Sequence, residues 1–356
     1  MKRRTTAPIN AMIVFLMAVL LMAGCSANDP GWSEKTEPAL GTVSQIRIHS
    51  DDRSKGDTAI REAFLRVQEI ENHLSFWDSD SQIGRVNANA GRASITMTDD
   101  VLFMIEEGLR HYDLTDGLFH IGLGTLTRLW GLNSTEPRIP ETQQVQAALE
   151  ALDLQHIQIA GNDVMIRQTG TAIDLGGIAK GYALDEAARV LRDLGIHSGF
   201  LNFGGDVYAL GEKPDGEPWY VGIKEPIPGA NQLVGRMGVV NLSVMTSGDY
   251  ERYVVDEEKG ERLHHILDPR TGRPAANELA SVTIVSDTSL QGDIFSTAAF
   301  VMGLEHGYRY VFETPDVEGL FITRDGEVYQ TPGLEGIFEL MNDNYVMTEM
   351  EIEFDE

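Results

Sequence analysis

The stretch AIDLGGIAKGYALDEAARVL, residues 172–191, places an aspartate, a glycine pair and a lysine within seven residues, just ahead of an amphipathic run. Gly176 and Gly177 permit a tight turn and close approach of the backbone to a ligand. The helix that follows offers free N–H groups to an oxygen anion, and Lys180 lies in its first turn. Asp174 is suited to a metal, to a ligand amide or to a helix cap. A strand-to-helix turn with a capping aspartate therefore remains open beside an anion site, and the spacing is not that of a P-loop.

A second group of oxygen-bearing side chains lies in SLQGDIFSTAAFVMG. Asp293 and Thr297 are four residues apart and Ser296 is three from Asp293, which puts all three on one side of a helix start. Hard cations such as Mg²⁺ take oxygen ligands and keep coordination places for phosphate or water. The alternative is an aspartate favoured by the helix dipole and a threonine bonded back to helix carbonyls.

The third candidate is the histidine pair of HHILDPRTGRP, which follows TSGDY along the chain. Histidine is the side chain best placed to accept a proton near neutral pH. Two consecutive histidines in a strand face opposite sides, so one of His264 and His265 is available to a site. A purely structural pair remains open, because the surrounding Asp-Pro and Thr-Gly dipeptides are turn formers in their own right.

The net charge decides which partners are compatible with these groups. The chain of 356 residues carries a formal charge of −27 and is 42% hydrophobic. Nucleic acid and electrostatic attachment to anionic lipid both require a basic surface, so we exclude both. An anionic ligand must be neutralised locally by a metal, a lysine or helix N-termini.

The first residues have the pattern of a targeting segment. Lys2, Arg3 and Arg4 precede an apolar run over 11–22, and small residues precede Cys25, the sole cysteine. The run is too short for a comfortable membrane span, and LMAGC resembles a bacterial lipoprotein box. We expect a signal peptide over 1–24, a lipid on Cys25, a tether over 25–38 and a mature chain facing an extracytoplasmic space. A plain signal peptide with an incidental cysteine is the alternative.

Strand and helix signals interleave without a regular βαβ period, which predicts an α+β fold. Alternation over 42–50 indicates a strand and helical spacing over 57–73 a helix. Residues 74–91 look like a polar loop, and VMIRQ with TAIDL looks like a hairpin. Further helices are expected over 99–112, 142–152, 178–194 and 290–306. Short strands separated by turns occupy most of 199–286, and 343–356 is expected to be a peripheral acidic tail, which leaves one domain over 39–342.

Taken in order, these segments resemble the ApbE family of FAD:protein FMN transferases. The resemblance covers roughly residues 40–305. It is carried by LGTVSQIRI, LSFWDSDSQIGRVN, DGLFHIGLGTLTRLWG, DLGGIAKGYALDEA, LNFGGD, TSGDY, HHILDPRTGRP and GDIFSTAAFVMG. Eight segments in the right order make a chance agreement very unlikely.

The resemblance implies a single α+β domain of the T-fold type that binds FAD in a groove. Such enzymes use Mg²⁺ to move the FMN half of FAD onto a threonine or serine hydroxyl of another protein, and they release AMP. The implied metal ligands are the carbonyl of Gly177 with Asp293, Ser296 and Thr297, and the implied base is His265. The implied FAD contacts are Leu40, Trp77, Leu118, Phe119, His120, Asp174, Lys180 and Leu267.

Three positions depart from the family pattern. Leu40 stands where the family commonly has methionine, His120 where an aspartate often follows the phenylalanine, and Ser296 where alanine is common. The change at His120 would alter flavin contact or pH dependence. The other two leave the implied chemistry intact.

Three functions are compatible with these residues. The first is the flavin transferase, whose acceptor would be an extracytoplasmic redox flavoprotein with a threonine- or serine-containing motif. The second is an FAD diphosphatase that uses the same Mg²⁺ site with water in place of the hydroxyl. The third is a flavin-binding lipoprotein without catalysis, against which the presence of Asp293, Thr297 and His265 counts.

Overall fold

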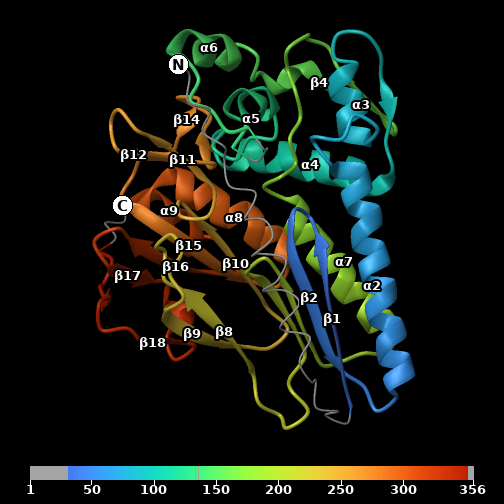
Figure 1. The fold of residues 1–356 in the computed structure, drawn as a ribbon, viewed down its shortest axis with the longest axis vertical. Helices are drawn as coiled ribbons and strands as arrows, with labels where there is room; N and C mark the ends of the chain where they lie inside the picture. Colours follow the sequence, from blue (N-terminus) through green and yellow to red (C-terminus); the bar gives the residue numbers. More distant parts are fainter. Residues whose placement is uncertain (1–30, 133, 135, 352–356) are drawn as a thin grey trace, which may run out of the picture.

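A computed structural model describes residues 31–132, 134 and 136–351. The expected signal peptide and Cys25 lie outside these residues. The fold has a large sheet, helices on one of its faces, a small sheet on the other and a helical group at one end (Figure 1). No helix of the described ranges is long and apolar enough to span a membrane.

A nine-stranded sheet of order β1-β2-β6-β7-β10-β15-β16-β17-β19 forms the centre of the fold. Neighbouring strands are antiparallel, except that β17 and β19 run parallel. The strands are β1 (Trp32–Ala39), β2 (Thr42–His49), β6 (Gly199–Phe203), β7 (Asp206–Leu210), β10 (Ser243–Gly248), β15 (Leu279–Ser286), β16 (Val317–Thr323), β17 (Glu327–Gln330) and β19 (Val346–Met347).

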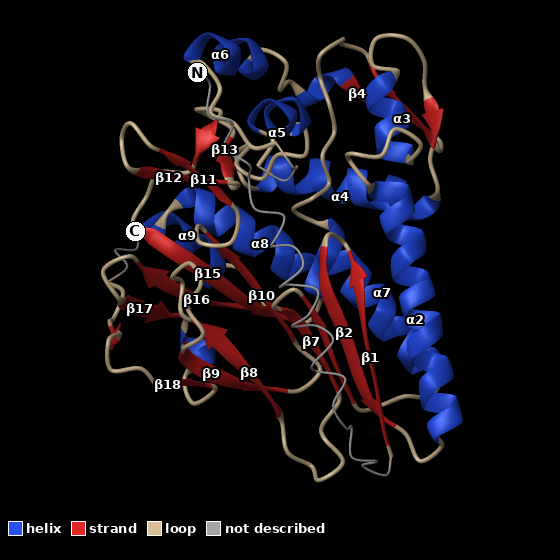
Figure 2. Cartoon of the chain, in the orientation of Figure 1, coloured by secondary structure: helices blue, strands red, loops and turns tan. Residues whose placement is uncertain are grey.

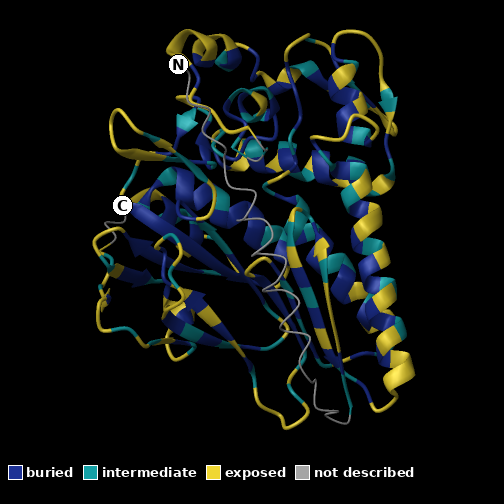
Figure 3. Ribbon diagram, viewed as in Figure 1, coloured by how far each residue is buried: buried dark blue, intermediate teal, exposed yellow. Residues whose placement is uncertain are grey.

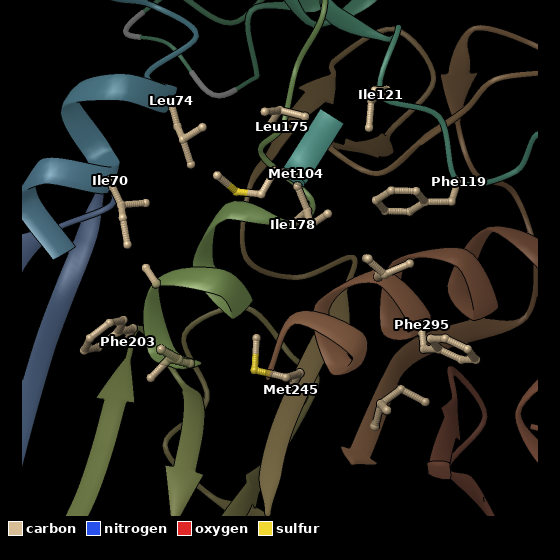
Figure 4. Packing of buried hydrophobic residues seen from close by; sticks show 14 of the residues in the cluster. Ile70, Leu74, Met104, Phe119, Ile121, Leu175, Ile178, Phe203, Met245 and Phe295 are labelled. Carbon is tan, nitrogen blue, oxygen red and sulfur yellow. The ribbon is translucent and has the colours of Figure 1, made fainter. Parts of the chain in front are cut away.

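Four helices cover one face of this sheet: α2 (Arg53–Leu74), α7 (Ala179–Asp193), α8 (Ser289–Met302) and α9 (Leu304–Phe312). In α2, buried side chains recur every three or four residues and Asp52 caps its first turn, which is the pattern of a helix with one apolar side. Helix α8 is buried on nearly all sides (Figure 3). Figure 4 shows Met245 of the sheet among Ile178, Phe295 and other buried side chains of the main core.

The opposite face carries a second core under a small sheet. Strands β8 (Trp219–Lys224), β9 (Leu233–Val239) and β18 (Phe338–Leu340) form this sheet in the order β18-β9-β8. Trp219, Val221 and Ile223 alternate with exposed residues along β8, so one face of the hairpin packs on the large sheet. The large sheet is therefore buried on both faces at its centre.

The helical group contains α3 (Gln82–Ala88), α4 (Asp99–Leu114), α5 (Gly124–Trp130), α6 (Thr142–Leu149) and the short sheet of β3 (Ile95–Thr96), β5 (Asp163–Ile166) and β4 (Ile157–Ala160). Figure 2 shows it beside the ends of α2 and α8. The remaining elements are the hairpins β11 (Tyr253–Asp256) with β12 (Glu261–His264) and β13 (Leu267–Asp268) with β14 (Arg273–Pro274), and the 3₁₀ turns η1 (Leu154–His156) and η2 (Pro332–Leu334).

The structure corrects both expected ends of the domain. Residues 32–38, expected in the tether, belong to the edge strand β1, which pairs with β2 over its whole length. The strand contains Glu34, Lys35 and Pro38, residue types that are typical of a linker, but an edge strand also tolerates charged residues and proline. At the other end, Tyr345 is buried and β19 pairs with β17, so the expected tail over 343–356 begins inside the fold.

Three internal predictions were also wrong in part. The loop expected over 74–91 contains α3. The hairpin partner of β5 is β4, whereas residues 171–175 form no strand. The helix expected over 290–306 is two helices, because Gly303 adopts φ +83° and Glu278 accepts a hydrogen bond from the N–H of Leu304. The α+β class and the single domain are confirmed.

Candidate active site

The loop before α7, which contains Gly176 and Gly177, is anchored by a buried residue before the glycine pair and another after it. Leu175 and Ile178 are buried in the main core, as Figure 4 shows. Between them, the glycine pair runs beside α8, because a Cβ at Gly177 would lie 3.9 Å from Oγ1 of Thr297 and 3.5 Å from the Phe119 ring. A larger residue would fill the space beside the Gly177 backbone, where a ligand atom is expected.

Asp174 does not cap α7, whose N-cap residue is Ile178. Oδ2 of Asp174 accepts a hydrogen bond of 2.7 Å from the Thr127 hydroxyl, and Oδ1 of Asp174 accepts one of 2.9 Å from the N–H of Gly176. Burial raises the pKa of Asp174, and these two donors oppose the rise. The side chain therefore joins the loop to α5.

Lys180 forms an ion pair with Asp206 at the start of β7. Asp206 is buried, and its Oδ1 accepts a hydrogen bond of 3.0 Å from the N–H of Thr246. Burial acts to lower the pKa of Lys180, but the negative charges of Asp206 and Asp293 outweigh it and hold the pKa above its usual value. Lys180 is thus a fixed cation among carboxylates.

Asp293 of α8 faces the start of α7. It is only 5% exposed, and its Oδ2 accepts a hydrogen bond of 3.0 Å from the N–H of Gly181. Burial raises the pKa of Asp293 to about 6, Lys180 opposes the rise, and Asp206 adds to it. A carboxylate in this condition gains from an additional cation.

Ser247 joins the hydroxyl groups of α8 to the sheet. Its Oγ lies 3.0 Å from Oγ of Ser296 and 3.3 Å from Oγ1 of Thr297. The Ser296 hydroxyl also bonds to the carbonyl of Asp293 at 3.1 Å, so it is engaged within its own helix. Thr297, beside Gly177, is the more available hydroxyl for a ligand.

These donors suit a magnesium ion. Within the described ranges, no three histidine, cysteine or acidic residues gather into a metal-binding group. Asp293, the Thr297 hydroxyl and the backbone of Gly177 supply a few hard oxygen donors, as Mg²⁺ requires when phosphate and water complete its coordination. The predicted metal residues are therefore brought together.

The two histidines have different surroundings, although Nδ1 of each is buried and has no hydrogen-bond partner among the described residues. Nε2 of His264 lies 2.9 Å from the carbonyl of Ala275, and its ring is edge-on to Phe300 in the core. His265 is half-buried, and its Nδ1 has no hydrogen-bond partner in the described part of the chain. Burial, with the positive charges of Arg252 and Lys180, lowers the pKa of His265 to about 3. It is therefore neutral at pH 7 and keeps a free nitrogen lone pair.

The aromatic pair lies near α5. Trp77 is 49% exposed, and its ring is edge-on to the buried Phe76, with ring centroids 5.1 Å apart. The Arg128 guanidinium lies over the ring of Phe76, 4.9 Å from the ring centroid. Phe76 is thus packed within the fold, and Trp77 is left free to stack on a ring system.

The other residues predicted to contact FAD differ in how far they are buried and in what they pack against. Phe119 is buried beside Gly177, Leu118 is half-buried, and Leu40 adopts φ +54° in the β1–β2 turn. His120 accepts a hydrogen bond of 3.0 Å from the N–H of Gly122 and packs edge-on to Tyr112. Leu267 belongs to a cluster with Leu126 and Trp130 of α5. The last two side chains thus have clear structural roles, and their contact with FAD stays a prediction.

Three residues of this site had no predicted role. Asp206 ends LNFGGD and Ser247 lies in TSGDY, so both belong to segments that the sequence singles out. Their roles depend on β7 and β10 lying side by side, close to α7 and α8. Thr127 is likewise invisible in the sequence, because only the fold brings it to Asp174.

Comparison with known proteins identifies the class of protein. The model of the ApbE family matches residues 40–321, and the chain belongs to this family. An FAD:protein FMN transferase of Klebsiella pneumoniae is 32% identical over 291 residues, which is 81% of this chain and 88% of that protein. A protein of the same name from Treponema pallidum is 31% identical over 310 residues, covering 83% and 85%.

Solved structures agree with this placement. An ApbE protein of Thermotoga maritima superposes with a TM-score of 0.78 at 30% identity, covering 86% of this chain and 99% of that one. The flavin transferase ApbE of Vibrio cholerae gives a TM-score of 0.76 at 26% identity, with the same coverage. The predicted family and fold are confirmed.

Proposed function

We propose that this chain transfers the FMN moiety of FAD to a threonine or serine hydroxyl of an acceptor protein and releases AMP. The observation that carries the proposal is the meeting of Lys180, Asp206 and Asp293 at the start of α7, in a chain of the ApbE family. A diphosphate needs its charge neutralised before a hydroxyl can attack it. Lys180, the first turn of α7 and a metal beside Asp293 together meet this need.

The transfer is a substitution at the phosphorus atom of the FMN half. The acceptor oxygen forms a bond to that phosphorus, the bond to the bridging oxygen breaks, and AMP carries that oxygen away. The hydroxyl proton would pass to the imidazole of His265, which is half-buried and neutral at pH 7. Trp77 would stack on the flavin, and Asp174 would hydrogen-bond to FAD, so that the diphosphate is held against Lys180.

Asp293, Thr297 and the carbonyl of Gly177 would hold Mg²⁺, with the Ser296 hydroxyl supporting Thr297 through Ser247. A magnesium ion bound there would lower the charge of the diphosphate and orient it. Asp293 is kept in place by the N–H of Gly181, so the metal site and the start of α7 are fixed together.

We further propose that the mature protein is anchored by a lipid on Cys25 and works on the extracytoplasmic side of a bacterial membrane. LMAGC and the basic and apolar segments before it support this placement. The acceptor would then be an extracytoplasmic redox flavoprotein.

The proposal is tested by incubating the chain in detergent with FAD, Mg²⁺ and threonine-containing acceptor proteins. Intact mass and fluorescence after denaturation report covalent FMN, and chromatography reports AMP. Asp293→Asn should lower transfer at least about 100-fold, whereas the exposed Asp287→Asn should leave it unchanged. AMP without covalent flavin for every acceptor tried would favour the FAD diphosphatase. Flavin binding without either product would leave a non-catalytic flavin-binding protein.

A further inference from the structure

A cavity of about 590 Å³ lies between α5, α6 and residues 168–170. This volume is in the range of sites that bind small molecules or short peptide segments. Small and apolar side chains form much of its wall: Leu129 of α5, Ala147 and Ala148 of α6, and Ala151 just beyond it. None of the residues assigned above to FAD, the metal or the proton lines it.

Helix α5 separates this cavity from the candidate active site. Thr125, Arg128 and Leu129 line the cavity, and their spacing of three and four residues puts them on one side of the helix. Thr127, on a different side, donates its hydroxyl hydrogen bond to Asp174. A molecule in the cavity is therefore one helix away from a predicted FAD contact.

The charge at the cavity differs from that of the rest of the chain. The chain carries −27, yet the lining includes the guanidinium groups of Arg128 and Arg138 and only one carboxylate, the exposed Glu150. Arg138 donates to the carbonyls of Leu129 and Arg128, which end α5. Arg128 lies over Phe76. Among the described residues no carboxylate forms a direct ion pair with it, and Asp174 attracts its charge only from a longer distance. Arg128 is therefore a cation available to an anionic partner.

The two helices that line the cavity also contact the β13–β14 hairpin, which follows His265 along the chain. Trp130 of α5 donates a hydrogen bond of 2.9 Å to the carbonyl of Gly272, and Arg273 donates one of 3.0 Å to Thr142 of α6. Gly272 has φ +67°, and a Cβ there would lie 2.7 Å from Val145. Helices α5 and α6 thus pack tightly on the β13–β14 hairpin, which follows His265 along the chain, so a polypeptide docked between them touches the same helices that hold this hairpin.

We propose that this cavity docks a segment of the acceptor polypeptide next to its modified hydroxyl residue. Small apolar side chains of the segment pack on the alanines of α6, and a carboxylate of the segment pairs with Arg128. The inference rests on the proposed function, since it presupposes a protein acceptor. Beyond that function, the inference names the surface that binds the acceptor, which is the cavity between α5 and α6, and the acceptor group that Arg128 recognises, which is a carboxylate.

The probes are fluorescein-labelled 11-residue peptides of alanine, glycine and serine with one central threonine. One aspartate is placed at each other position in turn, and asparagine replaces it in a matched set. Binding to the FAD-loaded full chain is measured by polarisation. For at least one position, the aspartate peptide should bind about 10-fold more tightly than its asparagine partner. Arg128→Gln should abolish this difference, and Arg128→Lys should retain part of it.

A second variant tests the cavity without changing charge. Ala147→Trp places a large ring in it from an exposed position on α6 and should weaken peptide binding at least 10-fold. Gln146→Trp, on the same helix but outside the lining, should not. Affinity for FAD, measured by flavin fluorescence, should be unchanged in both variants.

The two proposals fail in different ways. If every peptide binds equally well, or none binds, or Arg128→Gln preserves the preference for aspartate, the docking inference is wrong, whatever the chemistry. If the expected preference appears but neither covalent FMN nor AMP forms with any acceptor, the docking surface stands and the transferase function fails.

Discussion

At the scale of single residues, the site consists of groups that burial has moved away from their behaviour in water. The pKa of Asp293 is raised, that of His265 is lowered, and Lys180 stays charged because it is paired with Asp206. Each shift follows from removing a charge from water and placing it near another charge. The consequences can be measured one residue at a time.

The two adjacent histidines should respond differently to the same substitution. His265→Ala should slow transfer at least about 100-fold while FAD affinity is kept, because only proton transfer is lost. His264→Ala should lower the melting temperature, because it removes a buried hydrogen bond and a contact with Phe300, and should leave kcat within a few-fold. Steady-state kinetics and calorimetry of both variants check the pair. Equal transfer by His265→Ala and the parent would show that another group takes the proton.

His120 should make the stability of the fold depend on pH. Burial lowers the pKa of His120 to about 4, against about 6.5 in the unfolded chain. Because the unfolded state binds the proton more readily, the stability that His120 contributes is complete above pH 6.5 and is lost as pH falls towards 4. The loss between pH 7 and pH 5 is about 2 kcal/mol. His120→Gln should reduce the measured difference in unfolding free energy between these pH values by that amount, and an unchanged difference would contradict the assignment.

At the scale of elements, the site depends on the two helices that meet at Asp293. Asp185 of α7 accepts hydrogen bonds of 2.7 and 2.9 Å from the N–H groups of Ser289 and Leu290, the first residues of α8. In return, Asp293 of α8 accepts one from Gly181 of α7. Each helix thus satisfies backbone donors of the other, which sets their relative position.

Asp185→Ala should destabilise the fold by about 2 kcal/mol, because it leaves two N–H groups at the start of α8 without their acceptor. Urea unfolding followed by circular dichroism checks this change. Asp193→Ala, at the exposed end of the same helix, should cost less than about 1 kcal/mol. Similar losses for both variants would mean that Asp185 does not organise α8.

At the scale of the whole molecule, strand β1 begins at Trp32, seven residues after Cys25, where a lipid is expected. Seven residues span at most about 25 Å, so a lipidated chain would hold β1 near the membrane. The formal charge of −27 does not favour electrostatic binding to anionic lipid, so the proposed attachment would depend on the lipid itself.

Cys25→Ser should therefore move the protein from the membrane to the soluble fraction without changing transfer activity. Fractionation with immunoblotting and the FMN-transfer assay measure the two properties. A variant that remains on the membrane would show that the uncleaved apolar segment over 11–22 is the anchor.

The sequence by itself predicted the α+β class, and its resemblance to a known family predicted the family; both are confirmed. Lys180, Asp293 and Thr297 could be named as candidates from two short segments, because local spacing puts them at helix starts, whereas the metal role of Gly177 comes from the resemblance. Their roles towards FAD and Mg²⁺ stay predictions. Constraints of spacing act within a few residues and are therefore visible in the sequence. The edge strand β1 was missed for the opposite reason, since its pairing with β2, and not its composition, makes it a strand.

Only the tertiary structure decided which groups act together. Asp206 pairs with Lys180, Thr127 with Asp174 and Ser247 with Thr297, across separations of 26 to 50 residues. The different surroundings of His264 and His265, and the position of Arg128 beside a cavity, likewise depend on neighbours that are distant along the chain. Burial and electrostatic pairing arise from packing between elements, and no local pattern specifies them.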